Sequence, residues 1–157
     1  MEQSEFAQRV EGLTAQLYRT AYLYLGCEAD ALDAVDETVF LALKALRKLR
    51  QPEYFTTWMT RILINVCKAE LGRRKRFPRA EDAVEAGEDF CYDALPLREA
   101  IGHLPGDLRA VVILRYLTGY TLAETAESLG LPQGTVVTRQ RRALALLKLE
   151  LSEEGLE

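Results

Sequence analysis

Residues 121–149 read TLAETAESLGLPQGTVVTRQRRALALLKL and carry the strongest fold signal in the chain. Thr121 and Glu124 have the spacing of a capping box, in which hydroxyl and carboxylate oxygens accept hydrogen bonds from each other's backbone amides at the start of a helix. Gly130 and Pro132 predict the end of that helix, because glycine adopts the left-handed turn conformation and proline blocks continuation. Helical periodicity resumes directly afterwards, so the stretch predicts a helix-turn-helix.

The second helix of this motif is expected over residues 133–147 and separates apolar from polar side chains. Its apolar positions have helical spacing and comprise Val136, Ala143, Leu144 and Leu147. Its polar positions carry amide, hydroxyl and guanidinium groups, which read base edges and phosphates in the major groove. These positions are Gln133, Thr135, Thr138, Arg139, Arg141 and Arg142. The structural alternative is an ordinary helical hairpin with a solvated basic face.

Upstream of this motif, further stretches have apolar residues spaced by three and four, as in amphipathic helices. Gly26, Pro52 and Gly72 are expected to separate or end the first three of them. Asp107 is expected to be the N-cap of the last, with Tyr116 among its inward residues. The expected helices cover residues 3–25, 28–49, 54–71, 97–104 and 107–117.

The middle of the chain differs in composition from both flanks. Residues 78–96 hold six acidic residues and one basic residue, without helical periodicity. Residues 1–77 hold 12 basic and 10 acidic residues, and residues 97–157 hold 7 and 8. We therefore expect an all-α fold with two small helical domains, 1–77 and 97–157, joined by a flexible acidic linker over 78–96.

Aromatic and basic side chains are interleaved in residues 44–76, where Arg50 and Arg61 flank Tyr54, Phe55 and Trp58. This pattern suits single-stranded DNA, because rings stack on exposed bases while cations follow the backbone. The structural alternative is that Trp58 and Phe55 are core residues, and periodicity alone favours the core for Trp58 and leaves the role of Tyr54 open.

The composition argues against several other classes of protein. The chain has 48% apolar residues but no run near the ~20 that a membrane span needs. The N-terminal segment is acidic and shows no secretory signal, so we expect a cytoplasmic protein without direct membrane insertion. Its single histidine, His103, and its cysteines, Cys27, Cys67 and Cys91, lack metal-ligand or nucleophile spacing. We expect two buried thiols at positions 27 and 67, and no metal, cofactor or catalytic residue.

Two blocks of the sequence resemble the extracytoplasmic-function (ECF) group of sigma factors, the small promoter-specificity subunits of bacterial RNA polymerase. Residues 30–76, DALDAVDETVFLALKALRKLRQPEYFTTWMTRILINVCKAELGRRKR, resemble the sigma-2 domain. Residues 104–144, LPGDLRAVVILRYLTGYTLAETAESLGLPQGTVVTRQRRAL, resemble the sigma-4 domain. The chain departs from the family pattern at Asp36, Ala69, Gly72, Val137 and Gln140.

The resemblance implies roles for three groups of residues. A helix with Asp33, Asp36, Glu37 and Phe40 docks on core RNA polymerase. The melted downstream (−10) promoter element binds Arg50, Tyr54, Phe55, Thr57, Trp58, Arg61 and Asn65. The duplex upstream (−35) element binds the polar positions of the second helix together with Val137, which either touches a thymine methyl group or only lowers the affinity for phosphate.

The family also implies an anti-sigma factor as a further partner and an initiation function without catalysis. The net charge of −4 predicts that the free chain binds DNA weakly, since neutralised phosphates supply most non-specific affinity. Two alternatives remain: a stand-alone helix-turn-helix regulator, and a helical interaction protein without a DNA role. The first usually requires a dimer, and no heptad pattern for a coiled coil is present.

Overall fold

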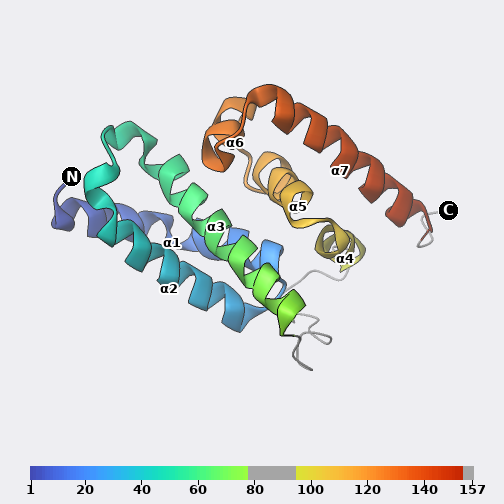
Figure 1. Cartoon of the computed structure of the whole chain (residues 1–157), viewed down its shortest axis with the longest axis horizontal. Coiled ribbons are helices and arrows are strands. Elements are labelled where there is room, and N and C mark those ends of the chain that lie inside the picture. The colour runs from blue at the N-terminus through green and yellow to red at the C-terminus, as the bar shows by residue number, and fades with distance from the viewer. Residues whose placement is uncertain (78–94, 154–157) are drawn as a thin grey trace.

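The computed structural model describes residues 1–77 and 95–153, and the described part is built from helices without a strand. The N-terminal half holds α1 (Gln3–Leu25), α2 (Glu28–Lys44), the short helices η1 (Leu46–Lys48) and η2 (Pro52–Tyr54), and α3 (Phe55–Arg76). The C-terminal half holds α4 (Leu95–His103), α5 (Gly106–Val112), η5 (Ile113–Leu117), α6 (Leu122–Leu129) and α7 (Gln133–Glu153). Figure 1 shows this order, and the expected all-α fold is confirmed.

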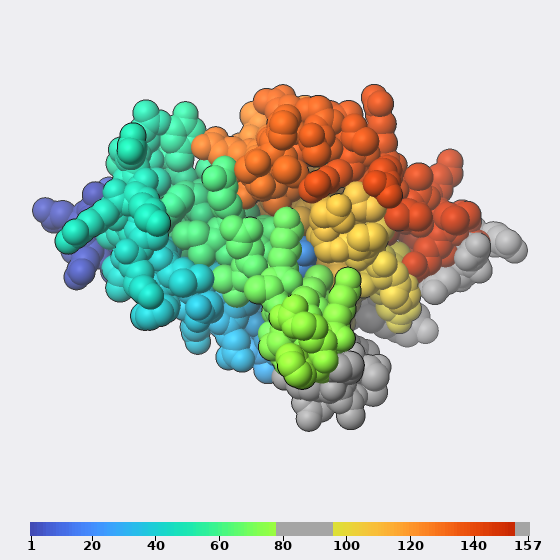
Figure 2. Space-filling view, viewed as in Figure 1, coloured from blue at the N-terminus to red at the C-terminus, as the bar shows by residue number. Residues whose placement is uncertain are grey.

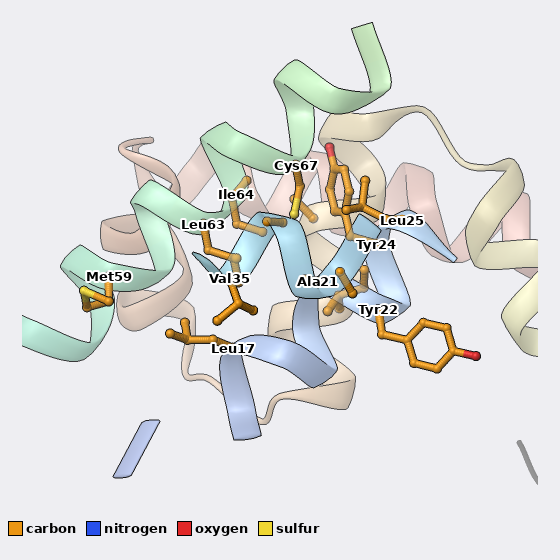
Figure 3. Packing of buried hydrophobic residues seen from close by; sticks show 14 of the residues in the cluster. Leu17, Ala21, Tyr22, Tyr24, Leu25, Val35, Met59, Leu63, Ile64 and Cys67 are labelled. Carbon is orange, nitrogen blue, oxygen red and sulfur yellow. The ribbon is translucent and has the colours of Figure 1, made fainter. Parts of the chain in front are cut away.

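The N-terminal half is a three-helix bundle, because α1, α2 and α3 each bury one apolar stripe against the other two. Leu17 and Ala21 of α1 and Leu63 and Ile64 of α3 belong to the same buried cluster (Figure 3). Val35 of α2 completes this centre, and these five side chains are almost fully buried. The three long helices expected in residues 1–77 are present and pack together as one bundle.

Several expected helix ends were wrong. α3 continues through Gly72 to Arg76, and α2 ends at Lys44 rather than near Leu49. α4 already begins at Leu95, so the last two residues of the expected linker are helical. The rest of that linker, residues 78–94, lies outside the described residues.

The helix-turn-helix forms as its local signals predict. The Thr121 hydroxyl accepts a hydrogen bond from the Glu124 amide (3.0 Å), and the Glu124 carboxylate accepts one from the Thr121 amide (2.8 Å). Gly130 ends α6 in the left-handed conformation at φ +67°. Val111, Ala126 and Val136 form a small buried cluster that fixes the angle between α6 and α7.

Other details of the C-terminal half differ from expectation. Pro105, not Asp107, occupies the N-cap of α5, and Asp107 lies in its first turn. Tyr116 and Leu144, both expected to face inward, are 48% and 40% exposed. α5 widens into one π-helical turn, η5, which shifts the register of the residues that follow Val112.

The two halves pack directly against each other. α6 and α5 lie against α3, while α4, α5 and η5 lie against α1. In Figure 2 the green atoms of α3 meet the yellow and orange atoms of the C-terminal half. One continuous hydrophobic cluster runs through both halves, from Phe6 in α1 to Leu147 in α7.

Arginine side chains cap the C-terminal end of α1, where backbone carbonyls have no partner within the helix. Arg109 of α5 donates to the Tyr24 carbonyl (2.6 Å), and Arg98 of α4 donates to the Gly26 carbonyl (2.9 Å). Arg74 of α3 donates to the Leu25 carbonyl (2.9 Å). Since Arg98 and Arg109 belong to the C-terminal half, the end of α1 is completed by docking of that half.

Candidate nucleic-acid interface

The outer face of α7 is open to solvent. Val136, Ala143 and Leu147 point inward and are buried. At 100° per residue, the opposite face therefore centres on Thr138 and Arg141. α7 runs along the edge of the molecule on the side away from α1–α3 (Figure 1). Among the seven expected contacts, Gln133, Thr138, Arg141 and Arg142 are exposed, and Thr135, Val137 and Arg139 are half-buried.

Two residues of α7 are held from the side by the scaffold helices. Arg139 Nε lies 3.9 Å from the Asp107 carboxylate, which turns its guanidinium toward α5. Arg115 donates to the Gln140 side-chain oxygen (3.0 Å) and to the Tyr120 carbonyl (2.7 Å). Gln140 thus serves to lock α7 onto the scaffold, and the centre of the solvent-exposed face lies at Thr138, Arg141 and Arg142.

A second surface lies around η2 and the first turns of α3. There a cavity of about 340 Å³ is lined by Lys48, Leu49, Arg50, Gln51, Tyr54, Thr57, Trp58, Arg61 and Glu127. The Tyr54 ring is 44% exposed at its rim, and Trp58 is half-buried in its wall. Aromatic walls and three cations fit an extruded base and its phosphates.

This cavity, called the η2 cavity below, unites most of the residues expected to bind a single strand. Asn65 is exposed two turns further along α3 and does not line it. Phe55 lies elsewhere: it is 4% exposed and packs edge-on against the Phe6 ring at a centroid distance of 6.0 Å. The ring of Phe55 therefore anchors α3 in the core.

Three acidic residues of α2 lie on one outward face. Asp33, Asp36 and Glu37 are exposed, and the Phe40 ring is 55% exposed on the same helix. Leu32 and Leu43 are also exposed on this helix. An apolar stripe edged with carboxylates is typical of a protein-binding surface, in which charge steers a basic partner.

Sequence patterns missed the residues that join the two halves. The η2 cavity includes Glu127, which follows Arg61 by 66 positions. The Tyr120 hydroxyl is buried against the Thr60 hydroxyl at 2.8 Å, and burial raises its pKa. The sequence pattern identifies Tyr120 at most as an apolar residue. It does not predict the contact with Thr60, which lies 60 positions earlier in the chain.

The remaining expectations concern thiols, metals and membranes. Cys67 is buried as expected, Cys27 is only half-buried, and Cys91 lies outside the described residues. Within 1–77 and 95–153, no group of three His, Cys, Asp or Glu side chains could hold a metal ion. None of the helices over the same ranges combines the length and the apolar character that crossing a membrane requires.

Comparison with known proteins connects both surfaces to one family. Residues 10–77 match the family described as Sigma-70 region 2, and residues 100–149 match Sigma-70, region 4. RNA polymerase sigma factor SigV of Bacillus subtilis is 33% identical over 143 residues, which cover 88% of this chain and 86% of the relative. The ECF RNA polymerase sigma factor SigM of Mycobacterium tuberculosis is 33% identical over 136 residues, which cover 84% of this chain and 69% of the relative.

Solved structures share the arrangement of helices. CnrH, determined in complex with the cytosolic domain of CnrY, has a TM-score of 0.75 at 27% identity, with 98% of this chain and 92% of the other covered. The sigma factor RpoE of Bartonella quintana, determined with the anti-sigma factor NepR, has a TM-score of 0.77 at 22% identity. That match covers 94% of this chain and 97% of the other, and it supports the fold alone.

Proposed function

The chain belongs to the ECF group of RNA polymerase sigma factors, and from this membership we propose which of its surfaces hold the polymerase and the promoter. As a sigma factor it binds core RNA polymerase, directs it to specific promoters and helps to open the DNA for initiation. The stand-alone regulator is not favoured, because both sigma regions occur in one chain and in the family's order.

The observation that carries the proposal is the presence of two surfaces that differ in shape and chemistry. The outer face of α7 is a convex helix with hydroxyl and guanidinium groups, which fits a duplex major groove. The η2 cavity is concave and aromatic, which fits a base that has left the duplex. A factor that recognises one promoter element as duplex and another as single strand needs both shapes.

We assign the −35 element to Gln133, Thr138, Arg141 and Arg142, with Thr135 and Val137 at the sides of that face. We assign the −10 element to the η2 cavity. Arg50 and Arg61 contact its phosphates, and Tyr54 and Trp58 stack against its bases. Thr57 and Asn65 add polar contacts. We assign the acidic face of α2 to core polymerase, and the exposed Phe40 ring is the apolar anchor of that face.

The chain performs this role by binding, and we assign it no catalytic residue. Strand opening is driven by contacts that exist only with the flipped base, since extrusion costs a few kcal/mol that the pocket must offset. We propose that the chain acts in the cytoplasm, where bacterial polymerase binds promoter DNA.

The deciding experiment is transcription of fragmented genomic DNA by purified core polymerase, with and without the chain, followed by mapping of transcript 5′ ends. We expect new start sites that share two sequence elements and that appear only with the chain. Purified chain without polymerase should bind the same fragments weakly. If addition of the chain produces no new start sites, the proposal is rejected.

Matched variants separate the three surfaces. For the −10 surface, Tyr54→Ala should lose about 1–3 kcal/mol of base stacking. Its control, Tyr116→Ala, removes a similarly exposed ring elsewhere.

For the −35 surface, Arg142→Ala should lose about 1–3 kcal/mol per base contact. Its control is Lys148→Ala, which changes another exposed basic residue of α7. For the polymerase surface, Asp36→Lys reduces holoenzyme formation, with Glu11→Lys on α1 as control. If a variant and its control have equal effects, the residue does not belong to the binding surface to which it is assigned.

We also propose that an anti-sigma factor controls the chain. The similar CnrH and the RpoE of Bartonella quintana were each determined with a bound protein, which in the second case is an anti-sigma factor. Affinity purification from the native cell should recover a second small protein in addition to polymerase. Recovery of polymerase alone under repressing and inducing conditions would contradict this.

A further inference from the structure

An ion pair between α5 and α7 borders the face assigned to the −35 element. Arg139 Nε lies 3.9 Å from the Oδ2 atom of Asp107, in the first turn of α5. This distance allows Coulomb attraction but is too long for a hydrogen bond. Among the residues that the structure describes, none accepts a hydrogen bond from the Arg139 guanidinium, so its N–H groups are available to a ligand.

The Asp107 carboxylate is itself held in place. Its Oδ1 atom accepts a hydrogen bond from the Leu108 amide at 3.0 Å, while its Oδ2 atom faces Arg139. The start of a helix also favours a negative charge. The two side chains of the pair are 47% and 27% exposed, so a molecule that binds to α7 can reach the pair without a change in the fold.

Arg139 lies on the flank of the exposed face of α7. It follows Thr135 by four positions and precedes Arg142 by three, so these side chains are neighbours on the helix surface. Rotation of α7 about its own axis is opposed by Arg115, which donates to the side-chain oxygen of Gln140, the next residue, at 3.0 Å. The flank that carries Arg139 is therefore fixed next to α5.

The neighbouring carboxylate changes what Arg139 can bind. A phosphate is bound mainly through positive charge, and the Asp107 carboxylate both offsets that charge and repels the phosphate. At a separation of 3.9 Å this effect persists at physiological salt, where the Debye length is about 8 Å. A guanine edge is neutral and offers two acceptors, O6 and N7, to a guanidinium. The pair therefore disfavours a phosphate much more than a guanine.

We propose that Asp107 is a positioning residue that directs Arg139 to a guanine of the −35 element instead of to the DNA backbone. The inference rests on the proposed assignment of that element to α7, and it adds one base contact at the flank of the exposed face. Arg139 supplies the hydrogen bonds to the base, and Asp107 acts only through Arg139. Pro105 occupies the N-cap of α5, which leaves the Asp107 side chain available for this role.

The chain offers a test variant, a rescue and a matched control. Asp107→Asn removes the charge but keeps an oxygen that can accept from the Leu108 amide, and Asp107→Ser serves if that variant fails to fold. Asp107→Glu retains a carboxylate and is the rescue. Arg139→Ala removes the proposed base contact itself. Glu99→Gln is the control, since it removes one exposed carboxylate of α4 that forms no ion pair with a described residue.

The experiment measures how holoenzyme, reconstituted from core polymerase and each variant, binds fluorescent promoter duplexes. One set of duplexes carries every single-base change in the mapped −35 element. Wild type and Glu99→Gln should prefer guanine at one position by at least about fivefold, the lower end of what a bidentate contact provides. Arg139→Ala should lose the preference at that position alone. Asp107→Asn should lose most of it, and Asp107→Glu should restore it.

Salt dependence separates this role from a merely structural one. In Asp107→Asn the released Arg139 can neutralise a phosphate, which should steepen the plot of log affinity against log salt concentration by about 0.9. An α7 that was only loosened would bind more weakly without a steeper slope. In the Arg139→Ala background, Asp107→Asn should change neither the slope nor the base preference more than Glu99→Gln does.

The outcomes are decisive in both directions. A guanine preference that depends on both residues, together with the steeper slope, supports the inference. Equal base preferences and slopes for Asp107→Asn and Glu99→Gln overturn it, as does a guanine preference that survives Arg139→Ala. The proposed function is judged separately, because Arg142→Ala and Lys148→Ala are compared in transcription and leave the ion pair intact.

Discussion

One arginine illustrates how much tertiary structure a single side chain can organise. Arg109 is 9% exposed, and its guanidinium donates to the carbonyls of Tyr24 (2.6 Å), Gly102 (2.6 Å) and Leu104 (2.9 Å). It also lies 5.3 Å from the centre of the Tyr24 ring. Burial lowers its pKa, while the neighbouring Tyr24 opposes this shift. The residue joins the end of α1 to α4 and α5, and its position in an apolar stretch gave no indication of this.

Replacement of Arg109 should therefore be costly. Arg109→Met keeps much of the apolar volume but leaves three carbonyls without their donor. We expect a loss of at least about 3 kcal/mol in the free energy of unfolding, because hydrogen bonds to charged groups are worth about 1.5–3 kcal/mol each. Urea unfolding measures the change. Arg19→Met, at an exposed position of α1, should stay within about 0.5 kcal/mol. A loss below about 1 kcal/mol for Arg109→Met would contradict the capping role.

Burial also makes Cys67 chemically inert. Its side chain is completely buried, and burial raises the pKa of its thiol to about 12, with Arg74 opposing the shift. At pH 8 only about one thiol in ten thousand would be ionised, and the thiolate is the reactive form. Iodoacetamide treatment of the folded protein followed by peptide mapping should modify Cys27 far faster than Cys67. Equal rates in the folded state, with both rising on unfolding, would show that α3 opens readily at this point.

Among the helices, the well-predicted ones have ends set by local chemistry. α6 starts at a capping box and stops at a left-handed glycine, and both signals lie within ten residues of sequence. α3 behaves differently. Glycine in a helix costs about 1 kcal/mol relative to alanine, yet α3 passes through Gly72. The following turn is held by Arg74, which pairs with Asp30 and the Leu25 carbonyl, and these partners lie on other helices.

The capping box of α6 provides a test of the local contribution. Thr121→Ala removes the acceptor for the Glu124 amide and should lower the free energy of unfolding by about 1 kcal/mol. Thermal unfolding followed by circular dichroism measures this. Thr14→Ala is the matched control, because that exposed hydroxyl only bonds back to the Val10 carbonyl of its own helix. If both variants shift the midpoint equally, the box contributes nothing specific.

Most of the buried core of the described chain forms one continuous cluster despite its two sigma regions. Side chains from α1, α3, α4, α5 and α7 belong to a single buried cluster, and Arg98 and Arg109 complete the end of α1 from the other half. Burial of this interface is driven by apolar area, and its polar contacts fix the relative position of the halves. Neither half can lose its fold without exposing part of the other.

The two halves should consequently unfold together. Trp58 reports on the N-terminal half, whereas circular dichroism at 222 nm reports on all helices. We expect urea transitions from the two probes to coincide in the wild type, as required of a single cooperative unit. In Gly106→Ala the two curves should separate, because an added Cβ would lie 2.7 Å from the Tyr24 hydroxyl oxygen and weaken the shared interface. Two distinct transitions in the wild type would mean that the halves fold independently.

Local pattern was sufficient to predict the helix-turn-helix and the helices apart from several of their ends, and it nominated two candidate DNA surfaces. Capping, glycine turns and spacings of three and four act over fewer than ten residues, so they can be read without a partner helix. Pattern could not tell Phe55, which is buried against Phe6, from Tyr54, which stands at the cavity rim, because both occupy one turn. Nor could it find Arg139 turned toward Asp107, or Arg61 bonded to the Glu127 carbonyl of α6. Those arrangements depend on how helices far apart in sequence dock, and docking is set by the shape and charge of assembled surfaces, which exist only after the helices have packed.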